Sequence, residues 1–147
     1  MYKNILVATD GSKLSDKAVT SAIEIAQAMG ARVTAFYAAP DYPLPAYADG
    51  VVYEPVSRRE YAKLAAADAK KILDDVAAKA SSAGIDCETA YTIAAAPWEA
   101  ILAAAKKHKC DAIVMASHGR RGVSALLLGS ETQKVLTHSK LPVLVVR

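Results

Sequence analysis

Short apolar runs alternate with longer segments of helical period along this chain, and that alternation limits the possible fold more than any other feature. The apolar runs predict strands at residues 5–9, 32–38, 85–93, 112–116 and 142–147. Between them, apolar residues at helical spacing predict helices that begin near residues 14, 57, 97 and 130. Strands separated by helices run parallel, and right-handed crossovers place the helices on both faces of the sheet. We therefore expect an α/β fold with an open parallel sheet.

Length and composition narrow the class of protein. A chain of 147 residues suggests one domain over residues 1–147. Hydrophobic residues make up 53%, yet no apolar run approaches the roughly 20 residues that span a bilayer, so we expect no membrane segment. The first residues lead straight into a strand without a signal-peptide core. The two cysteines, Cys87 and Cys110, are too few for a disulfide framework, so we expect a cytoplasmic protein.

Several local signals mark where elements begin and end. Gly30 and Gly84 are placed to end the first two helices, and Ser57 with Glu60 predicts a capping box. Residues 40–55 contain four prolines and three tyrosines without a clear period, and we predict a long loop there. Long loops in compact domains often cover a site. Its tyrosines would lie over a ligand or only pack the loop down, and the sequence leaves both readings open.

The stretch after the strand at residues 112–116 has the composition of an anion site. Its loop carries three glycines and two arginines: Gly119, Arg120, Arg121, Gly122 and Gly129. Ser130 and Gln133 stand three apart, as in a capping box, so the last helix is predicted to begin at Ser130. The free N–H groups and positive dipole end of that helix would attract an anion, and a phosphate fits best.

The fold class places a second loop opposite this one. Ligands of open parallel sheets bind at the carboxyl ends of the strands, where the strand order reverses. If the first and fourth strands are neighbours, Asp10 lies opposite the loop of residues 119–129. Asp10 would bond a ribose hydroxyl or bind a divalent cation. The simpler alternative is an ordinary Asp-Gly turn.

These residues resemble a known family. Ala116-Ser117-His118-Gly119, nine further residues and then Gly129-Ser130 resemble the nucleotide-binding signature of universal stress proteins, Gly-x2-Gly-x9-Gly-(Ser/Thr). The resemblance extends over the whole chain, from Ile5–Ser12 to Leu141–Val146. It implies a Rossmann-like open five-stranded parallel sheet in the order 3-2-1-4-5, a small homodimer and, in members with an intact signature, bound ATP.

One position departs from the signature, because Ala116 stands where the family has its first glycine. The added methyl group would narrow the approach of a ligand to the backbone. Alanine is nevertheless allowed where φ is negative, as at the end of a strand. We expect a weakened or slightly reshaped ATP site rather than a lost one. ATP would bind with Mg or Mn, for which Asp10 is the predicted metal ligand.

The resemblance also implies roles for single residues. The glycine-rich loop would curl its N–H groups toward phosphate oxygens. Ser130 would offer its hydroxyl, with a plain N-cap as the alternative, and the next amides would contact the same phosphate. Ala8, Thr9 and Ala38 would border the nucleoside, and one of the arginines would screen the phosphate charge. The predicted binding residues are Ala8, Thr9, Asp10, Ala38, Ala116, Ser117, His118, Gly119, Arg120, Arg121, Gly122, Gly129, Ser130, Glu131 and Thr132.

Other site chemistry has little support. His118 lacks an orienting partner for general-base catalysis and is interpreted as a loop histidine near the ligand. His108 and Cys110 lack further ligands at zinc spacing. The chain has neither a P-loop nor a Gly-x-Gly-x-x-Gly motif after its first strand. A net charge of +3 from scattered basic residues does not indicate nucleic acid binding.

The last strand and the motif together give the functional hypotheses. Residues 143–146 are continuously apolar and lie at a sheet edge in the expected order, so a homodimer through Leu141–Arg147 is predicted. The first hypothesis is an ATP-binding stress regulator, with at most slow hydrolysis, whose nucleotide state is read by an unknown protein partner. The alternative is a dimeric stress or signalling module with a degenerate site. A weaker third hypothesis is a nucleotide hydrolase with Asp10 as its metal-binding residue.

Overall fold

A five-stranded parallel sheet forms the centre of the structure, a computed structural model that describes residues 1–43, 46–53, 56–120 and 127–147. Its strands are β1 (Asn4–Ala8), β2 (Arg32–Pro40), β5 (Cys87–Ala94), β6 (Ala112–Ala116) and β7 (Val143–Val146). They lie in the order β5-β2-β1-β6-β7 and every neighbouring pair is parallel. Counted along the chain, these strands have the order 3-2-1-4-5, which confirms the predicted topology.

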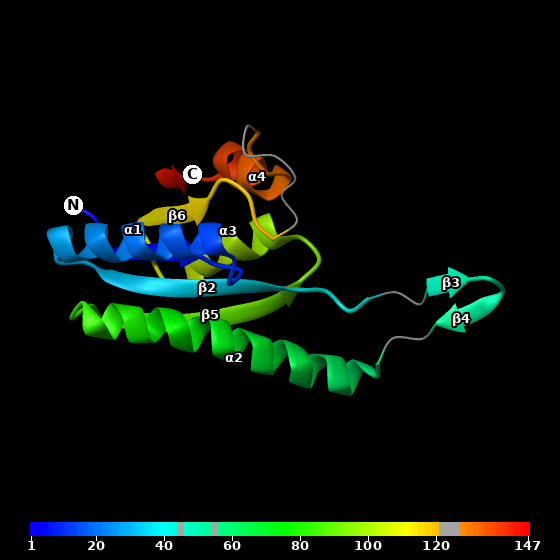
Figure 1. Ribbon diagram of the computed structural model, residues 1–147. Helices are drawn as coiled ribbons and strands as arrows, with labels where there is room; N and C mark the ends of the chain where they lie inside the picture. The colour runs from blue at the N-terminus through cyan, green and yellow to red at the C-terminus, as the bar shows by residue number, and fades with distance from the viewer. Residues whose placement is uncertain (44–45, 54–55, 121–126) are drawn as a thin grey trace.

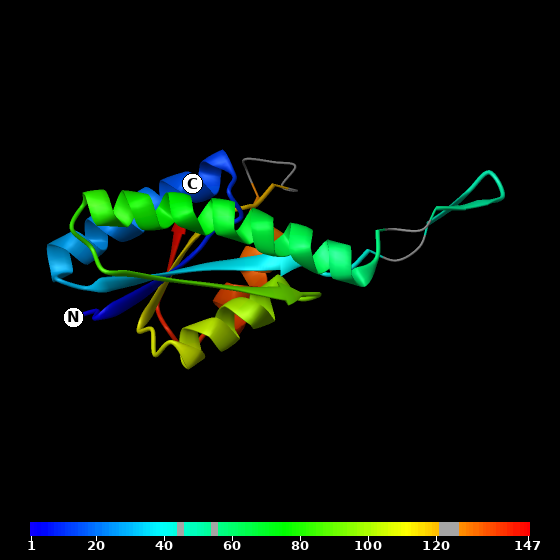
Figure 2. The same ribbon diagram turned by 90° about the horizontal axis from the view of Figure 1, so that it is seen from below.

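Two helices cover each face of this sheet (Figure 2). α1 (Lys13–Met29) and α2 (Arg58–Ser82) pack on one face, and α3 (Pro97–Lys107) and α4 (Ser130–His138) pack on the other. Successive residues of a strand point to opposite faces, so Ile5 and Val7 join the core under α1 and α2, whereas Leu6 joins the core under α3 and α4. Because both faces are buried, β1 and β6 consist almost wholly of apolar residues.

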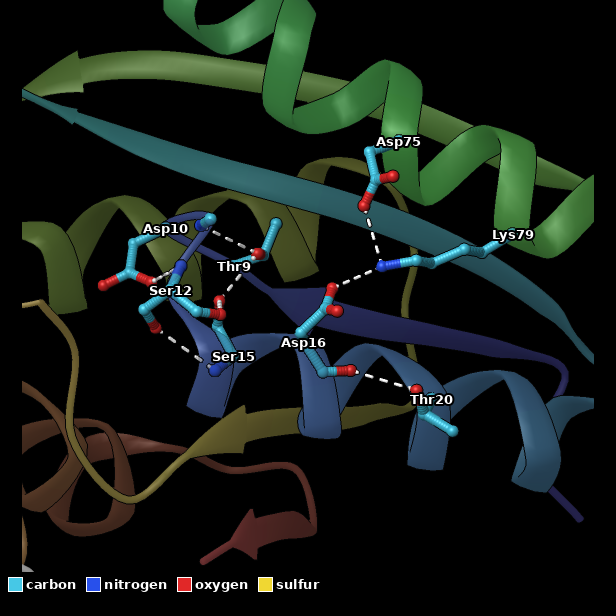
Figure 3. A network of polar contacts seen from close by, with 9 residues as sticks. Thr9, Asp10, Ser12, Ser15, Asp16, Thr20, Asp75 and Lys79 are labelled. Carbon is cyan, nitrogen blue, oxygen red and sulfur yellow. Dashed lines mark hydrogen bonds and ion pairs between the residues drawn. The ribbon is translucent and has the colours of Figure 1, made fainter.

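The predicted helix ends are confirmed where a side chain or a glycine makes the cap. The side chain of Ser57 accepts from the Glu60 N–H and the Glu60 carboxylate accepts from the Ser57 N–H, which completes the capping box. Gly30 ends α1 in the left-handed region at φ 65°. Lys79 of α2 contacts Asp16 of α1 at 2.5 Å and Asp75 at 2.8 Å, so an ion-pair network ties the two helices together (Figure 3).

The prediction of a long loop at residues 40–55 is wrong. β2 continues to Pro40, and the segment contains a small antiparallel hairpin, β3 (Ala46–Ala48) and β4 (Val51–Tyr53), which projects away from the sheet (Figure 1). Asp49 and Gly50 make its two-residue turn with φ of 50° and 72°. An Asp-Gly pair with positive φ is favoured in such turns, and this signal was missed.

A polar network fastens the strands at their amino ends. The Thr34 hydroxyl donates to Asn4 Oδ1 at 3.0 Å, and Asn4 Nδ2 donates to the His108 carbonyl at 2.9 Å. The Asp111 carboxylate accepts from the main-chain N–H groups of Lys3 and Asn4. These bonds join β1, β2 and the segment before β6, and they leave the carboxyl ends of the same strands available for a site.

Within the described residues, no helix combines the length and the apolar character that a membrane crossing requires.

The Thr34 hydroxyl provides a test of this network. Thr34 is fully buried, so Thr34→Val keeps the shape of the side chain but leaves Asn4 Oδ1 without its donor. The free energy of unfolding should fall by about 1–3 kcal/mol, measured by urea denaturation. Thr20→Val removes an exposed hydroxyl that bonds only to Asp16 of its own helix, and it should change stability by less than about 0.5 kcal/mol. Equal losses in the two variants would contradict the assigned role.

Candidate functional site

A cavity of about 670 Å³ opens at the carboxyl ends of the strands, where β1 and β6 separate. The pairing of β1 with β6 stops at Val7 and Val114, whereas β1 stays bonded to β2 through the Thr9 N–H, which donates to the Phe36 carbonyl. The loops after β1 and β6 therefore diverge around a crevice. This is the position at which open parallel sheets bind ligands.

The cavity brings together most of the residues predicted from the sequence. Those that line it are Ala8, Asp10, Ala38, Ala116, His118, Gly119, Arg120, Gly129, Ser130, Glu131 and Thr132. Thr9 and Ser117 do not line it, since both are buried beside it. Arg121 and Gly122 fall outside the described residues.

Thr9 and Ser117 shape the loops instead. The Thr9 hydroxyl accepts from the Gly11 N–H at 3.2 Å and lies 3.1 Å from the Ser15 hydroxyl (Figure 3). The Ser117 N–H donates to the Val146 carbonyl at 2.8 Å, which extends the pairing of β6 with β7 by one residue. Both residues hold the main chain that carries the cavity walls.

The Asp10 carboxylate joins the two loops across the crevice. Its Oδ1 accepts from the Ser12 N–H at 2.9 Å, and its Oδ2 accepts from the Arg120 N–H at 2.8 Å. Burial raises the pKa of Asp10, but hydrogen bonds from Ser12, Arg120 and Ser15 outweigh burial and hold the pKa below its ordinary value. The predicted position of Asp10, opposite the loop after β6, is confirmed.

Two glycines of the signature are required by close packing within the protein. A Cβ at Gly119 would lie 2.6 Å from Asp10 Oδ2. A Cβ at Gly129 would lie 3.2 Å from His118 Cα and 3.3 Å from the Ser117 carbonyl oxygen, to which the Gly129 N–H donates at 2.7 Å. The loop after β6 is therefore closed at its base by the backbone itself, and larger residues would open it.

The start of α4 corrects one prediction. The helix begins at Ser130 as expected, but its N-cap is Gly129 and no side chain caps it. Gln133 Nε2 donates to the Leu128 carbonyl at 3.1 Å, so Ser130 and Gln133 do not form a capping box. Thr132 donates from its hydroxyl to the Ala116 carbonyl at 3.0 Å and fixes α4 against the end of β6.

Three helix N-termini border the cavity, and they differ in which side chains accept hydrogen bonds from their main-chain N–H groups. At α1, Ser12 Oγ accepts from the Ser15 N–H, and Asp10 accepts from the Ser12 N–H. At α3, Glu131 Oε2 accepts from the Trp98 N–H at 2.9 Å, although Glu131 belongs to α4. Among the described residues, no side chain serves the N-cap of α4. The first turn of α4 is therefore the end best suited to an external anion.

The other half of the cavity is apolar and was not predicted. Its walls come from the end of β2, the end of β5, the start of α3 and the end of β6, and they include Pro40, Ala94, Pro97, Ile101 and Met115. These segments are far apart in the sequence and meet only in the folded sheet. A cavity with one apolar half and one anion-binding half suits a ligand that carries a flat apolar group and a charged tail.

Metal binding by protein ligands alone has no support in the described residues, where no group of three or more His, Cys, Asp or Glu side chains comes together. Three acidic residues line the cavity, and each already accepts from a main-chain N–H: Asp10, Asp41 and Glu131. A Mg or Mn ion would fit here only if ligand phosphates supplied further oxygens. His108 Nδ1 lies 3.0 Å from Glu88 Oε1.

Comparison with known proteins gives the family. The sequence model of the Universal stress protein family matches residues 1–147. The universal stress protein in the QAH/OAS sulfhydrylase 3′ region of Thermus aquaticus is 37% identical over 147 residues, which is 100% of both chains. The structure of universal stress protein UspA from Lactobacillus plantarum has a TM-score of 0.76 at 29% identity, over 99% of this chain and 98% of that chain.

A further solved structure is described as a universal stress protein in complex with cAMP. It has a TM-score of 0.71 at 30% identity and covers 99% of this chain and 97% of that chain. The family match over the full chain, the sheet order and the spacing from Gly119 to Gly129 agree with one another. This chain belongs to the universal stress protein family.

Proposed function

We propose that the cavity binds ATP, with the phosphates at the first turn of α4 and the adenosine in the apolar half. The open N-terminus of α4 carries this proposal, because the other two helix ends at the cavity already have carboxylate acceptors. A carboxylate at each of those ends repels a polyphosphate, whereas the amides of α4 attract one. Glu131 belongs to the first turn of α4, but its carboxylate accepts from the Trp98 N–H and from Lys134. The complex of a universal stress protein of 30% identity with cAMP supports a nucleotide as the class of ligand.

Individual residues keep the roles that the sequence suggested. Ser130 would offer its hydroxyl to the phosphates, Glu131 and Thr132 would present their main-chain N–H groups, and Arg120 would screen the charge. Ala38 would contact the adenine through its backbone. Ala8 and Thr9 would border the nucleoside, although Thr9 offers only its main chain from its buried position. Arg121 and Gly122, which lie outside the described residues, retain their predicted phosphate roles.

Asp10 would bond the ribose or supply one oxygen to a Mg or Mn ion that the phosphates also bind. We propose at most slow hydrolysis, since no carboxylate among the described residues pairs with His118 to make it a stronger base; its Nδ1 lies 3.3 Å from the hydroxyl of Ser117. The protein would then act in the cytoplasm as a nucleotide-responsive stress regulator. Its unknown protein partner would recognise the change that ATP causes around the loop after β6.

The charge at the first turn of α4 provides the direct test. Ser130→Glu places a carboxylate beside the proposed phosphates, and it should weaken ATP binding by at least about tenfold, measured by calorimetry with Mg present. Because an acidic residue in the first turn of a helix stabilises it, this variant should fold normally. Thr137→Glu adds the same charge to the same helix, at an exposed position away from the cavity, and should bind ATP like the wild type.

The alternative function, a dimeric module with a degenerate site, gives a different result. Wild-type protein would then release no adenine nucleotide on extraction and show no calorimetric ATP binding. A steady-state ATP turnover far above that of Ser130→Glu would instead favour the hydrolase hypothesis.

We also propose a homodimer through the last strand. β7 is an edge of the sheet, and Leu144 on it is 45% exposed. Two copies of β7, paired antiparallel about a two-fold axis through Leu141–Arg147, would cover the edge strand of each copy.

A charge on that edge tests the dimer. Leu144→Lys should convert the protein to a monomer at micromolar concentration, measured by analytical ultracentrifugation, because pairing would bury the new ammonium group. Thr89→Lys places the same charge on β5, the opposite edge, and should leave the dimer intact. A monomeric wild type, or equal dissociation of the two variants, would contradict the proposed interface.

A further inference from the structure

A second hollow, of about 390 Å³, adjoins the first cavity on the side of α2. The two share Tyr37, Pro40 and Arg120 as lining residues. The remaining walls of the second hollow come mainly from the first half of α2 and include Tyr61 and Leu64. The shared residues make the two hollows neighbours, which is the arrangement that an extended ligand with two ends requires.

Arg120 stands at the junction of the two hollows. Its main-chain N–H donates to Asp10, and its guanidinium lies over Gly11, where a Cβ would be 2.9 Å from Nη2 and 3.0 Å from Ile72 Cγ1. The side chain therefore extends from the loop after β6 toward α2. Among the described residues, the guanidinium forms no ion pair with a carboxylate. A cation in this position suits phosphate groups that pass from one hollow to the other.

The walls of the second hollow suit a flat group with N–H donors. The Tyr61 ring is fixed, because its hydroxyl donates to the Pro40 carbonyl at 2.5 Å and its edge packs against Tyr42 with centroids 5.4 Å apart. Leu64 is 60% exposed, which makes it an uncovered apolar surface on the rim. A nucleobase stacks well on such aromatic and apolar surfaces.

Asp68 adds a hydrogen-bond acceptor to this hollow. Its Oδ2 accepts from the Tyr37 hydroxyl at 3.1 Å, and its other carboxylate oxygen can accept from an exocyclic amino group of a base. Burial and the neighbouring Asp68 raise the pKa of Tyr37 to about 12, so the phenol stays protonated and remains the donor. The Tyr37 hydroxyl thus holds the Asp68 carboxylate in place.

We propose that this universal stress protein binds dinucleoside polyphosphates, with one nucleoside in the main cavity and the second in the hollow beside α2. The inference rests on the proposed nucleotide site and adds a ligand class to it. The bridging phosphates run from the first turn of α4 to the guanidinium of Arg120. Tyr61 and Leu64 contact the second base, and Asp68 accepts from its amino group. ATP occupies the main cavity alone and leaves the second hollow to solvent.

Calorimetric titration with diadenosine tetraphosphate and with ATP tests the proposal, since ATP has a similar charge but lacks the second nucleoside. The wild type should bind diadenosine tetraphosphate about tenfold more tightly than ATP, the gain expected for one stacked base. Leu64→Glu should abolish that difference and leave ATP affinity within about twofold, because Leu64 does not line the main cavity. Ala67→Glu, at an exposed position of α2 that lines neither hollow, should retain the difference.

The outcomes separate this inference from the ATP proposal. Equal affinities for the two ligands in the wild type would overturn the second subsite while leaving ATP binding intact. The second subsite would also be overturned if Leu64→Glu and Ala67→Glu lost the tighter binding of diadenosine tetraphosphate equally. It would likewise be overturned if Leu64→Glu weakened the binding of ATP as much as that of diadenosine tetraphosphate. Absence of binding of either ligand to the wild type would overturn both proposals.

Discussion

The Asp10 carboxylate fixes the spacing of the two loops on which the cavity depends. Each of its oxygens accepts a main-chain N–H, one from the loop after β1 and one from the loop after β6. These bonds offset the cost of burying the charge and keep the pKa of Asp10 low, so the group is ionised at neutral pH. Gly119 belongs to the same arrangement, because any side chain there would collide with the carboxylate. Asp10 and Gly119 therefore act together to fix the spacing of the two loops.

The distribution of carboxylates around the cavity then sets its polarity. β1, β5 and β6 each lead into a helix whose N-terminus borders this edge of the sheet, and each such end attracts anions. Asp10 already occupies the end of α1, and Glu131 occupies the end of α3. In the part of the chain that the structure describes, the first turn of α4 is then the helix end at the cavity without such a carboxylate cap. In the proposed function, a phosphate would be oriented because the protein's own charges occupy the other two ends.

The sequence predicted those parts of the fold that depend on local patterns. Apolar period, capping boxes and helix-ending glycines act over a few residues, and the structure confirms Ser57–Glu60 and Gly30 in these roles. The strand order followed from the family resemblance, because local patterns do not say which strands pair. The hairpin was not predicted because its strands, β3 and β4, have only three residues each, too few to show an alternating period in a segment rich in proline.

The candidate site was predictable only where a motif is contiguous. Its glycines and the start of α4 were found, whereas the apolar half was not, since its walls come from distant segments. The cap on α3 comes from Glu131, 33 residues after Trp98, and no local signal reveals such a bond. The prediction of Ser130 as the N-cap was wrong, because a Ser-x-x-Gln spacing does not show which residue is the first with helical backbone angles. The N-cap is Gly129, whose backbone is extended with ψ of 151°, and Ser130 is the first helical residue.

Ala116 shows why one departure from a family signature need not remove the site. It lies in β6, pairs with Val146 and belongs to the buried cluster under α1 and α2. Its carbonyl accepts from the Thr132 hydroxyl, and that bond is available to any residue at this position. The groups that would hold a phosphate are main-chain amides of α4, and their positions depend on Gly119 and Gly129. In the proposed ATP site, the close packing at those two glycines would therefore contribute more than the identity of the residue at position 116.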